Sequence, residues 1–396
     1  MFKQLGYFIL YIFISLLTTS CQAKPEGTMP DKPLEIALNM TAKELYDANP
    51  EYKAFQEGDA QPMGVTFQGY DFPRYKEPTV TIKYPNGEIS IDGVMSILAY
   101  DDNKQENYKL SNINLGFLFN HKVSGISDEN AYKEMMSLFK ELQEKGWTYA
   151  HSNSAPRLTA KDSFTYAITE GGSELYLDYS YPLTFKDWMQ LSDLQLWRLK
   201  YGTETYMDIR INRQTDPSTS KRHYLISLNV YNELEKIQTN LDSKDRGRWQ
   251  NAYTEIYPEL ALWRLENETS AIRMSLKIQQ DQPDYTLPLV LEKTGIDTSK
   301  FVSIDPYKIT YEEFIKRQEA GEDMTPYYEN QPTAKPEITS QAKGRCPANQ
   351  PCPKSGYWFT LAKADSRAYF KQGDIMPNYP NNNWGEVIWQ FDGEKA

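Results

Sequence analysis

Apolar and polar residues alternate along four stretches of this chain, with the period of two that is typical of a half-buried β-strand. These stretches are residues 65–69, 79–84, 88–94 and 113–119. Asn86-Gly87 lies between the second and the third, and it favours a hairpin turn because both residues tolerate a positive φ. We expect the apolar residues of these two strands, Val80 and Ile82 among them, to face each other across the hairpin.

A helical period replaces this alternation at residues 128–145, where apolar residues recur every three or four positions. Ser127 is a good N-cap and Gly146 is a good stop signal, so this segment is the clearest helix of the sequence. Similar patterns and capping boxes predict helices over residues 42–48, 188–199, 232–256 and 311–321. Further strands are predicted over residues 164–168, 207–211 and 224–230, and a hairpin over residues 260–278.

Grouped along the chain, these elements predict an α+β protein, with two sheet-plus-helix domains followed by a small disulfide-stapled, β-rich C-terminal module. The predicted boundaries are 1–20 for a signal peptide, 21–40 for a tether, 41–180 and 181–310 for the two domains, 311–344 for a helix and linker, and 345–396 for the module. The two domains have a similar composition of strands and helices, but no residue-level repeat relates them. A duplication therefore stays open.

The first 20 residues have the pattern of a secretory signal. Their apolar run, residues 5–17, has 13 residues, whereas a helix that spans a membrane needs about 20. The run leads through small residues into Cys21, which resembles the lipobox of bacterial lipoproteins, although Thr18 stands where Leu or Val is usual. This resemblance implies that Cys21 is lipidated, and Gln22 after it implies the outer membrane, facing the periplasm. The alternative is an ordinary signal peptide with Cys21 incidental.

The composition argues against some classes of partner. The chain has 396 residues, with 43 Lys and Arg against 54 Asp and Glu, a net charge of −11. Nucleic acids bind to basic surfaces, so we expect no nucleic-acid partner. The same charge disfavours adsorption to anionic lipid, so membrane contact is expected only through the N-terminal lipid anchor. No pattern in the sequence indicates an oligomeric state.

Two cysteines remain if Cys21 carries the lipid. Cys346 and Cys352 have the spacing C-x5-C within a proline-containing segment. In an oxidising periplasm this pair is expected to form a disulfide, which would stabilise the module by roughly 2–3 kcal/mol through loop closure. A metal site is the alternative, but it needs further Cys or His ligands nearby. The three histidines are all far from this pair in the sequence: His121, His151 and His223.

No catalytic signature is present in the sequence. It has no G-x-S-x-G elbow, no H-E-x-x-H zinc motif and no phosphate-binding P-loop. We therefore predict a protein that is not an enzyme and that has no catalytic residue, no metal and no cofactor. An envelope hydrolase is the alternative, because a glycosidase uses two carboxylates that can lie far apart in the sequence.

The C-terminal module is rich in aromatic residues, with nine in the 35 residues from Tyr357 to Phe391. Its distinctive residues are Cys346-Pro347, Cys352-Pro353, Ser355-Gly356-Tyr357-Trp358, Arg367, Tyr369-Phe370, Gly373-Asp374, Met376-Pro377 and Trp389-Gln390. They resemble a short C-terminal module of immunity proteins from bacterial polymorphic-toxin and type VI secretion loci. The resemblance covers about 45 of the 396 residues, and it does not extend to residues 40–320.

The resemblance implies a binding function. A lipoprotein that faces the periplasm would bind a secreted antibacterial toxin and neutralise it by occluding the toxin's active site, so the expected partner is the toxin protein. Such an interface buries on the order of 1,600 Å² or more. The alternative, also without enzymatic activity, is an envelope lipoprotein that assembles a complex or binds peptidoglycan, because exposed tyrosine and tryptophan rings also stack on sugars.

The module offers candidates for the binding surface. They are Tyr357, Arg367, Tyr379 and Trp384. Tyr379 and Trp384 belong to an Asn/Pro-rich loop, where we expect exposed side chains. Trp358 and Phe370 are expected to pack in the core of the module, and Arg367 is expected to pair with a nearby acid such as Asp374.

Overall fold

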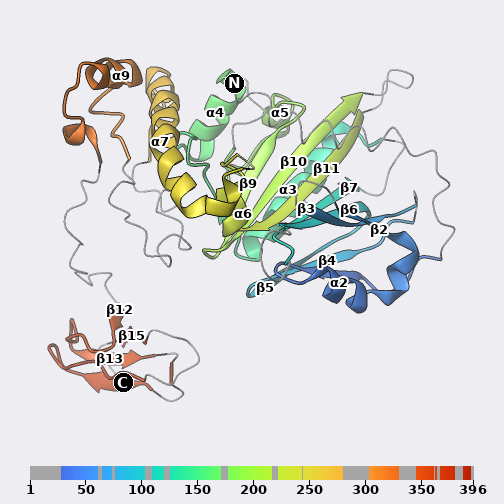
Figure 1. Ribbon diagram of the computed structural model, residues 1–396, viewed down its shortest axis with the longest axis horizontal. Helices are drawn as coiled ribbons and strands as arrows, with labels where there is room; N and C mark the ends of the chain where they lie inside the picture. The colour runs from blue at the N-terminus through green and yellow to red at the C-terminus, as the bar shows by residue number, and fades with distance from the viewer. Residues whose placement is uncertain are drawn as a thin grey trace. The chain divides into compact units, whose positions relative to one another are not determined.

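The chain divides into two units, the body (residues 1–329) and the tail (residues 330–396) (Figure 1). The structure is a computed structural model, and it describes residues 28–60, 65–73, 76–102, 109–119, 125–170, 177–215, 222–242, 244–279, 303–329, 345–360, 362–363, 366–379 and 387–393. The signal peptide, Cys21, Trp384 and most of the predicted linker lie outside these residues, so what was expected of them stays a prediction. Within the described ranges, no helix is both long and apolar enough to cross a membrane.

One antiparallel sheet of eight strands forms the centre of the body, in the order β2-β3-β6-β7-β11-β10-β9-β8 (Figure 1). The strands are β2 (Gln56–Ala60), β3 (Val65–Asp71), β6 (Val94–Asp102), β7 (Asn112–Leu118), β8 (Thr148–Tyr149), β9 (Leu196–Tyr201), β10 (Thr205–Thr215) and β11 (Arg222–Asn232). Strand β7 pairs directly with β11, although the sequence places them in different predicted domains. The predicted domains 41–180 and 181–310 therefore form one unit, because their strands share a sheet and a hydrophobic core.

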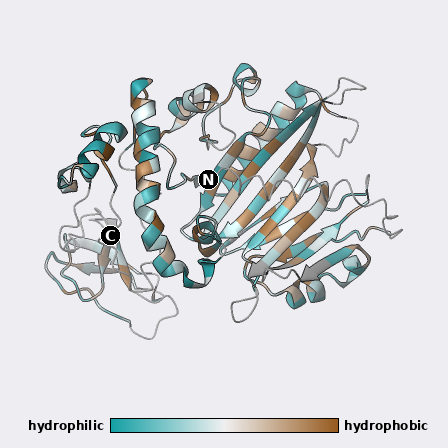
Figure 2. Ribbon diagram, turned by 45° about the horizontal axis from the view of Figure 1, so that its top comes forward, coloured by the Kyte–Doolittle hydropathy of each residue, from teal (hydrophilic) through white to brown (hydrophobic). Residues whose placement is uncertain are grey.

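The two faces of this sheet differ in polarity, and Figure 2 shows hydrophobic and hydrophilic residues mixed along its long strands. On one face the side chains are apolar and buried, as are Leu115 on β7 and Leu228 on β11. A second, three-stranded sheet and helix α3 complete the core on this face; they are β1 (Leu34–Ala37), β4 (Val80–Tyr84), β5 (Gly87–Ile91) and α3 (Asp128–Glu144). The opposite face carries polar side chains, with Asn114 opposite Asn229 in the register. Burial of one face fixes this register, because a slip by one residue would exchange the two sets of side chains.

The predicted pairing of the β4–β5 hairpin is confirmed, because Val80 and Ile82 lie opposite apolar residues of β5. Its turn differs from the prediction. Gly87 already belongs to β5, so Pro85 and Asn86 are the two loop residues. Asn86 has a φ of 64°, and Pro85 suits the preceding position of a turn in which a single residue takes a positive φ.

Two predicted helices are confirmed together with their caps. Helix α2 (Ala42–Ala48) begins with a reciprocal capping box formed by Thr41 and Glu44. Helix α3 begins after Ser127, whose side chain accepts a backbone hydrogen bond, and Gly146 follows its end with a φ of 91°. The buried residues of its predicted apolar stripe are Met135, Phe139 and Leu142.

The remaining helices are η2 (Pro50–Phe55), α4 (Ala160–Glu170), α5 (Phe185–Trp188), α6 (Glu233–Gln238), η4 (Arg246–Arg248), α7 (Trp249–Arg273), α9 (Tyr311–Glu319) and η7 (Thr325–Tyr327). Among them, α9 confirms the helix predicted over residues 311–321 and its cap at Thr310, while others correct predictions. The strand predicted over residues 164–168 lies within α4, and most of the hairpin predicted over residues 260–278 lies within α7. Of the helix predicted over residues 188–199, only Trp188 is helical, as the last residue of α5, and residues 196–199 belong to β9. The helix predicted over residues 232–256 is divided between α6 and α7. Periodicity failed in α7 because Arg264 and Glu268 lie on its buried face, where charged residues interrupt the apolar pattern.

The tail contains the predicted β-rich module, a four-stranded sheet in the order β12-β15-β13-β14. Its strands are β12 (Arg345–Pro347), β13 (Gly356–Phe359), β14 (Ala368–Phe370) and β15 (Ile388–Gly393). Trp358 and Trp389 are both buried in its core, together with Met376. Phe370 packs on Trp389 with ring centroids 4.9 Å apart. The predicted packing roles of Trp358 and Phe370 are therefore confirmed.

The predicted disulfide of the tail is not found, because Cys346 and Cys352 are both free thiols that lie buried in its core. The sulfur of Cys346 lies 3.5 Å from the carbonyl oxygens of Pro347 and Pro351, and that of Cys352 lies 3.1 Å from the carbonyl oxygen of Lys354. Burial raises the pKa of both thiols above the ordinary value. Each sulfur is directed at backbone of its own turn, so apolar packing holds this small unit together without a covalent staple.

Candidate binding surface

Strand pairing in the tail brings three side chains onto one face. Residues of β13 alternate between the core and the opposite side, so Trp358 is buried and Tyr357 points away from it. Strand β14 pairs antiparallel with β13, and this register sets Tyr369 directly opposite Tyr357. Arg367 precedes β14, and its guanidinium lies over the ring of Tyr357. We call Tyr357, Arg367 and Tyr369 the tail face.

The tail face is exposed and ordered by its own contacts. The rings of Tyr357 and Tyr369 meet edge to face, with centroids 5.3 Å apart and planes inclined by 76°. The Cζ atom of Arg367 lies 4.2 Å from the centroid of the Tyr357 ring, within the range of a cation–π contact. Tyr369 is 52% exposed, and Arg367 is exposed as well. These side chains are therefore preformed at the surface, where a partner can reach them.

The structure brings together two of the four predicted binding residues, Tyr357 and Arg367. Tyr379 lies on the core side of the tail, half-buried, with its ring centroid 6.2 Å from that of Trp389. It therefore does not belong to the tail face. Trp384 lies outside the described residues.

Two details of the tail face differ from the prediction. Arg367 lies over an aromatic ring, and Asp374, the acid given as an example of its partner, accepts a hydrogen bond from the backbone N–H of Lys371 at 2.7 Å. A pairing of Arg367 with another nearby acid stays a prediction. Tyr369 was not among the candidates. Because its neighbour Phe370 was expected in the core, alternation along a strand already indicated that Tyr369 faces outward. The sequence does not reveal how β13 and β14 pair, and it is the register of this pair that places Tyr369 opposite Tyr357.

Most residues of the motif that resembles the immunity module serve the fold of the tail. Trp358 and Trp389 donate their indole N–H groups to the carbonyl oxygens of Lys354 and Pro377, at 3.2 and 2.8 Å. Gly373 takes a φ of 92°, which favours glycine, in the turn after β14. The motif thus describes how the module folds, and the surface available for binding has to be found from the side chains that the fold leaves exposed.

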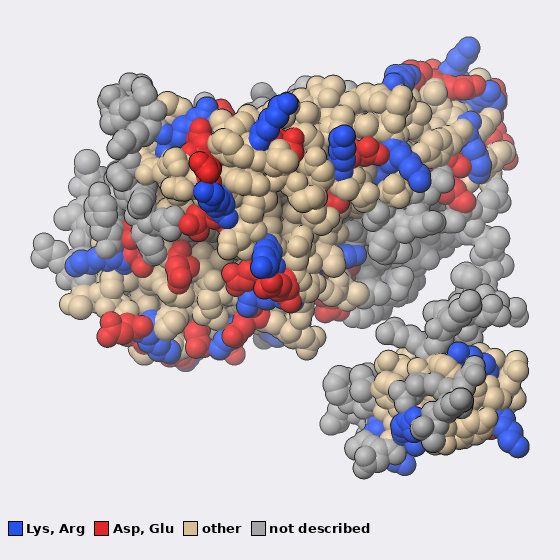
Figure 3. Space-filling view, turned by 180° about the vertical axis from the view of Figure 1, so that it is seen from behind, with Lys and Arg blue, Asp and Glu red and all other residues tan. Residues whose placement is uncertain are grey.

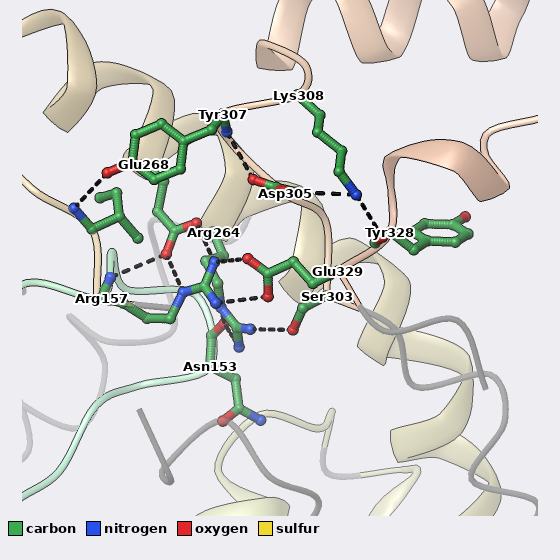
Figure 4. Close-up of polar contacts among 11 residues, drawn as sticks. Asn153, Arg157, Arg264, Glu268, Ser303, Asp305, Tyr307, Lys308, Tyr328 and Glu329 are labelled. Carbon is green, nitrogen blue, oxygen red and sulfur yellow. Dashed lines mark hydrogen bonds and ion pairs between the residues drawn. The ribbon is translucent and has the colours of Figure 1, made fainter. Parts of the chain in front are cut away.

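A buried charge cluster in the body was not predicted (Figure 4). The guanidinium of Arg157 forms two bonds with Glu268 on α7, at 2.7 and 2.9 Å, and two with Glu329, at 2.7 and 2.6 Å. Beside it, Arg264 donates to the carbonyl oxygen of Asn153 at 2.8 Å. The side chains of Arg157 and Glu268 are 1% and 0% exposed. No sequence pattern indicated this cluster, because Arg157 lies 111 residues from Glu268 and 172 residues from Glu329.

This cluster is arranged for stability and not for proton transfer. Burial would lower the pKa of Arg157, but its hydrogen bonds with Glu268 and Glu329 raise it above the ordinary value. Both carboxylates accept hydrogen bonds from the guanidinium, so neither is placed as a general base toward an open site. The cluster therefore fastens the last segment of the body to α7 and to the loop that carries Arg157.

His151 is the other buried titratable group of note in the body, with no exposed surface. Its ring centroid lies 4.3 Å from that of Tyr149. Burial, followed by the positive charges of Arg264 and Lys236, lowers the pKa of His151 to about 3. The imidazole is therefore neutral near pH 7, and it is placed as a core side chain.

Neither metal ligands nor known proteins add a further site. In the part of the chain that the structure describes, no group of three or more His, Cys, Asp or Glu side chains is arranged to hold a metal ion. Comparison of the chain with protein-family models, curated proteins and solved structures finds no match. The candidate site therefore rests on the geometry of the tail face.

Proposed function

We propose that this protein is an immunity protein of the bacterial cell envelope, which binds a secreted antibacterial toxin and neutralises it by covering the toxin's active site. The observation that carries this proposal is the tail face, in which exposed Tyr369 and Arg367 flank the half-buried Tyr357 and the three side chains hold one another in place. Tyrosine and arginine are enriched among the residues that dominate protein–protein binding energy. Side chains that are already ordered also lose less conformational entropy when a partner binds.

The geometry of the tail face favours a protein partner over a polysaccharide. A sugar ring stacks flat on the open face of an aromatic ring. The rings of Tyr357 and Tyr369 are inclined by 76°, so they do not form a flat platform. The guanidinium of Arg367 also occupies one face of the Tyr357 ring. For these reasons we place toxin binding ahead of peptidoglycan binding.

The tail face would anchor a larger contact. A stable protein interface buries about 1,600 Å² in total, roughly half of it from each partner. A large aromatic side chain buries only about 150–250 Å², so three side chains cannot account for such an interface. The contact must therefore extend beyond these three side chains.

The proposal places the protein on the outer membrane, facing the periplasm, through a lipid on Cys21. The signal pattern of residues 1–20 and the small residues before Cys21 support this placement. A toxin that is neutralised there acts in the periplasm, on phospholipid or on peptidoglycan.

A survival assay tests the proposed function. The gene is deleted from a bacterium that carries the neighbouring toxin gene, and it is returned as the wild type, as the double variant Y357A/Y369A or as F185A. Phe185 is an aromatic residue of the body that is 40% exposed, and it serves as the matched control. Beside toxin-producing siblings, we expect the deletion strain and the double variant to be lost, while the wild type and F185A survive.

Immunoblots must show equal amounts of each variant in the envelope. Normal growth of the deletion strain beside the producers would contradict the proposal. If the full chain retains muropeptides and the double variant does not, peptidoglycan binding becomes the better assignment.

A further inference from the structure

The body and the tail carry opposite net charges. Residues 330–396 contain eight Lys and Arg against six Asp and Glu, a net charge of +2, whereas residues 1–329 contain 35 against 48, a net charge of −13. On the side seen in Figure 3, the described part of the tail shows Lys and Arg without Asp or Glu, while the body shows both signs side by side. The tail is a positive unit on a negative protein.

The two units also hold their exposed lysines differently, although arginines of the body, such as Arg213, lie over aromatic rings as well. In the body, exposed lysines such as Lys43 pair with carboxylates one helical turn away. In the tail, the Nζ atom of Lys354 lies 3.4 Å from the ring centroid of Phe391, and that of Lys363 lies 4.9 Å from the ring centroid of Tyr379. Every ion pair between described residues lies in the body.

An ammonium group over an aromatic ring is held in place but keeps its charge. The ring attracts the cation through its quadrupole and carries no net charge, so it does not neutralise the ammonium group as a carboxylate would. Lys354 and Lys363 are both exposed, so a carboxylate of a partner can approach them from the solvent. The tail thus presents two oriented cations, Lys354 and Lys363.

We infer that the tail recognises an acidic protein surface, whose Asp and Glu carboxylates pair with Lys354 and Lys363. The inference rests on the proposed function and names the chemistry of the toxin surface that the tail contacts. A body with a net charge of −13 repels an acidic partner, while the positive tail attracts it, so encounters are steered to the tail.

Other polyanions fit the chain less well. Nucleic acid and anionic membranes present negative charge over an extended surface. An extended polyanion of this kind is repelled by the net charge of the whole chain, which is −11. An acidic patch on a folded protein is small enough to meet the tail alone.

A binding assay without the toxin tests the inference. Residues 22–396 are titrated into fluorescein-labelled octaglutamate at low salt, and the anisotropy of the label is measured. We expect the wild type to bind, and K354Q/K363Q to bind about tenfold more weakly because two carboxylate partners are lost. Raising the salt to about 1 M should abolish binding, because the Debye length falls to about 3 Å.

Two further variants separate local chemistry from net charge and from misfolding. K43Q/K133Q removes the same two charges from the body, where both lysines already pair with carboxylates, and it should bind like the wild type. K354R/K363R keeps the charge over each ring and should retain binding. If the arginine variant loses binding as well, charge is not what the peptide recognises and the inference fails.

Other outcomes also overturn it. These are a wild type that does not bind octaglutamate, and an equal loss in K354Q/K363Q and K43Q/K133Q. The wild type could bind phosphatidylglycerol vesicles and not octaglutamate, and K354Q/K363Q could abolish that binding. This result would show that the tail binds an anionic membrane. If K354Q/K363Q no longer binds octaglutamate but protects fully in the survival assay, the tail does recognise carboxylates. In that case this recognition plays no part in neutralising a toxin.

Discussion

Arg157 in the body and Arg367 in the tail are both held by neighbouring side chains, but by different chemistry. Arg157 is buried, and two carboxylates meet its guanidinium in paired hydrogen bonds. Arg367 is exposed and lies over the ring of Tyr357. A charge removed from water has to be compensated by opposite charge, whereas an exposed cation needs only a surface to rest on. The first arrangement keeps a charge in the interior, and the second keeps a charge at the surface.

The cores of the two units differ in a related way. The body joins two sheets and helix α3 around one large core, while the tail packs a few large side chains around Trp358 and Trp389. A small unit buries a smaller fraction of its surface, and many small domains add disulfides for that reason. The tail instead buries Cys346 and Cys352 as thiols. Its stability therefore depends on the packing of its aromatic residues.

The largest expected effect comes from removing the cation of the buried cluster. Arg157→Met would leave Glu268 and Glu329 as uncompensated carboxylates, one of them fully buried. The free energy of unfolding of the body should fall by about 3–5 kcal/mol. Hydrogen exchange at the amides of β10 and β11 measures it, because these central strands open only when the body unfolds.

Arg248→Met is the matched control for this prediction. Arg248 also bonds to two carboxylates, those of Asp245 and Glu255, but its side chain is 49% exposed. Water and salt screen such a pair, so the variant should unfold almost like the wild type. Equal losses in the two variants would show that burial does not distinguish the two clusters.

Acid should destabilise the body more than the tail. The expected loss of stability is smaller than that of Arg157→Met. The pKa of His151 is about 3 in the folded chain, because of burial and nearby positive charges, against about 6.5 when unfolded. As the pH falls below about 6.5, the unfolded chain binds a proton that the folded chain excludes, so the stability of the body decreases. At about pH 5 this group alone should lower the free energy of unfolding by about 2 kcal/mol relative to neutral pH.

His151→Phe should remove this contribution to the pH dependence, whatever it does to stability at neutral pH. Urea denaturation of the variant and of the wild type at both pH values gives the difference. The tail has no histidine and serves as an internal control in each experiment. An unchanged dependence on pH in the variant would contradict the assignment of His151 as a buried, neutral side chain.

The smallest expected effect is that of a reducing agent on the tail. Because Cys346 and Cys352 are free thiols, dithiothreitol should leave the unfolding of the tail almost unchanged. Loss of a disulfide that closes so short a loop would instead cost roughly 2–3 kcal/mol. Hydrogen exchange at β13 with and without the reductant measures the difference, and titration of the denatured chain should find both thiols reactive. A clear loss of protection on reduction would show that Cys346 and Cys352 form a disulfide after all.

Features that depend on a few neighbouring residues could be predicted from the sequence. The caps at Thr41 and Ser127 set the starts of α2 and α3, because the bonds that form them join residues three positions apart. The alternation around Val80 set the pairing of β4 with β5 for the same reason. Even there the choice of loop residues was wrong, because Pro85 allowed a turn that starts one residue earlier.

Features that join distant residues could not be predicted. The face of α7 that carries Arg264 and Glu268 is buried against polar groups from other segments, the carbonyl oxygen of Asn153 and the guanidinium of Arg157. The apolar pattern of α7 alone resembled strands. The predicted disulfide followed from spacing, but spacing does not set where two sulfur atoms point.

The tail face shows the same division. The sequence by itself determined that the C-terminal segment forms an aromatic β-rich module, and it offered Tyr357 and Arg367 as candidates for a binding surface. Only the tertiary structure decided that Tyr369 joins them, that Tyr379 does not, and that strand β7 pairs with β11 to make one body from two predicted domains. The alternating pattern of a strand specifies which side chains share a face, but the same pattern fits many partner strands. The partner and its register are settled by the packing of the whole core.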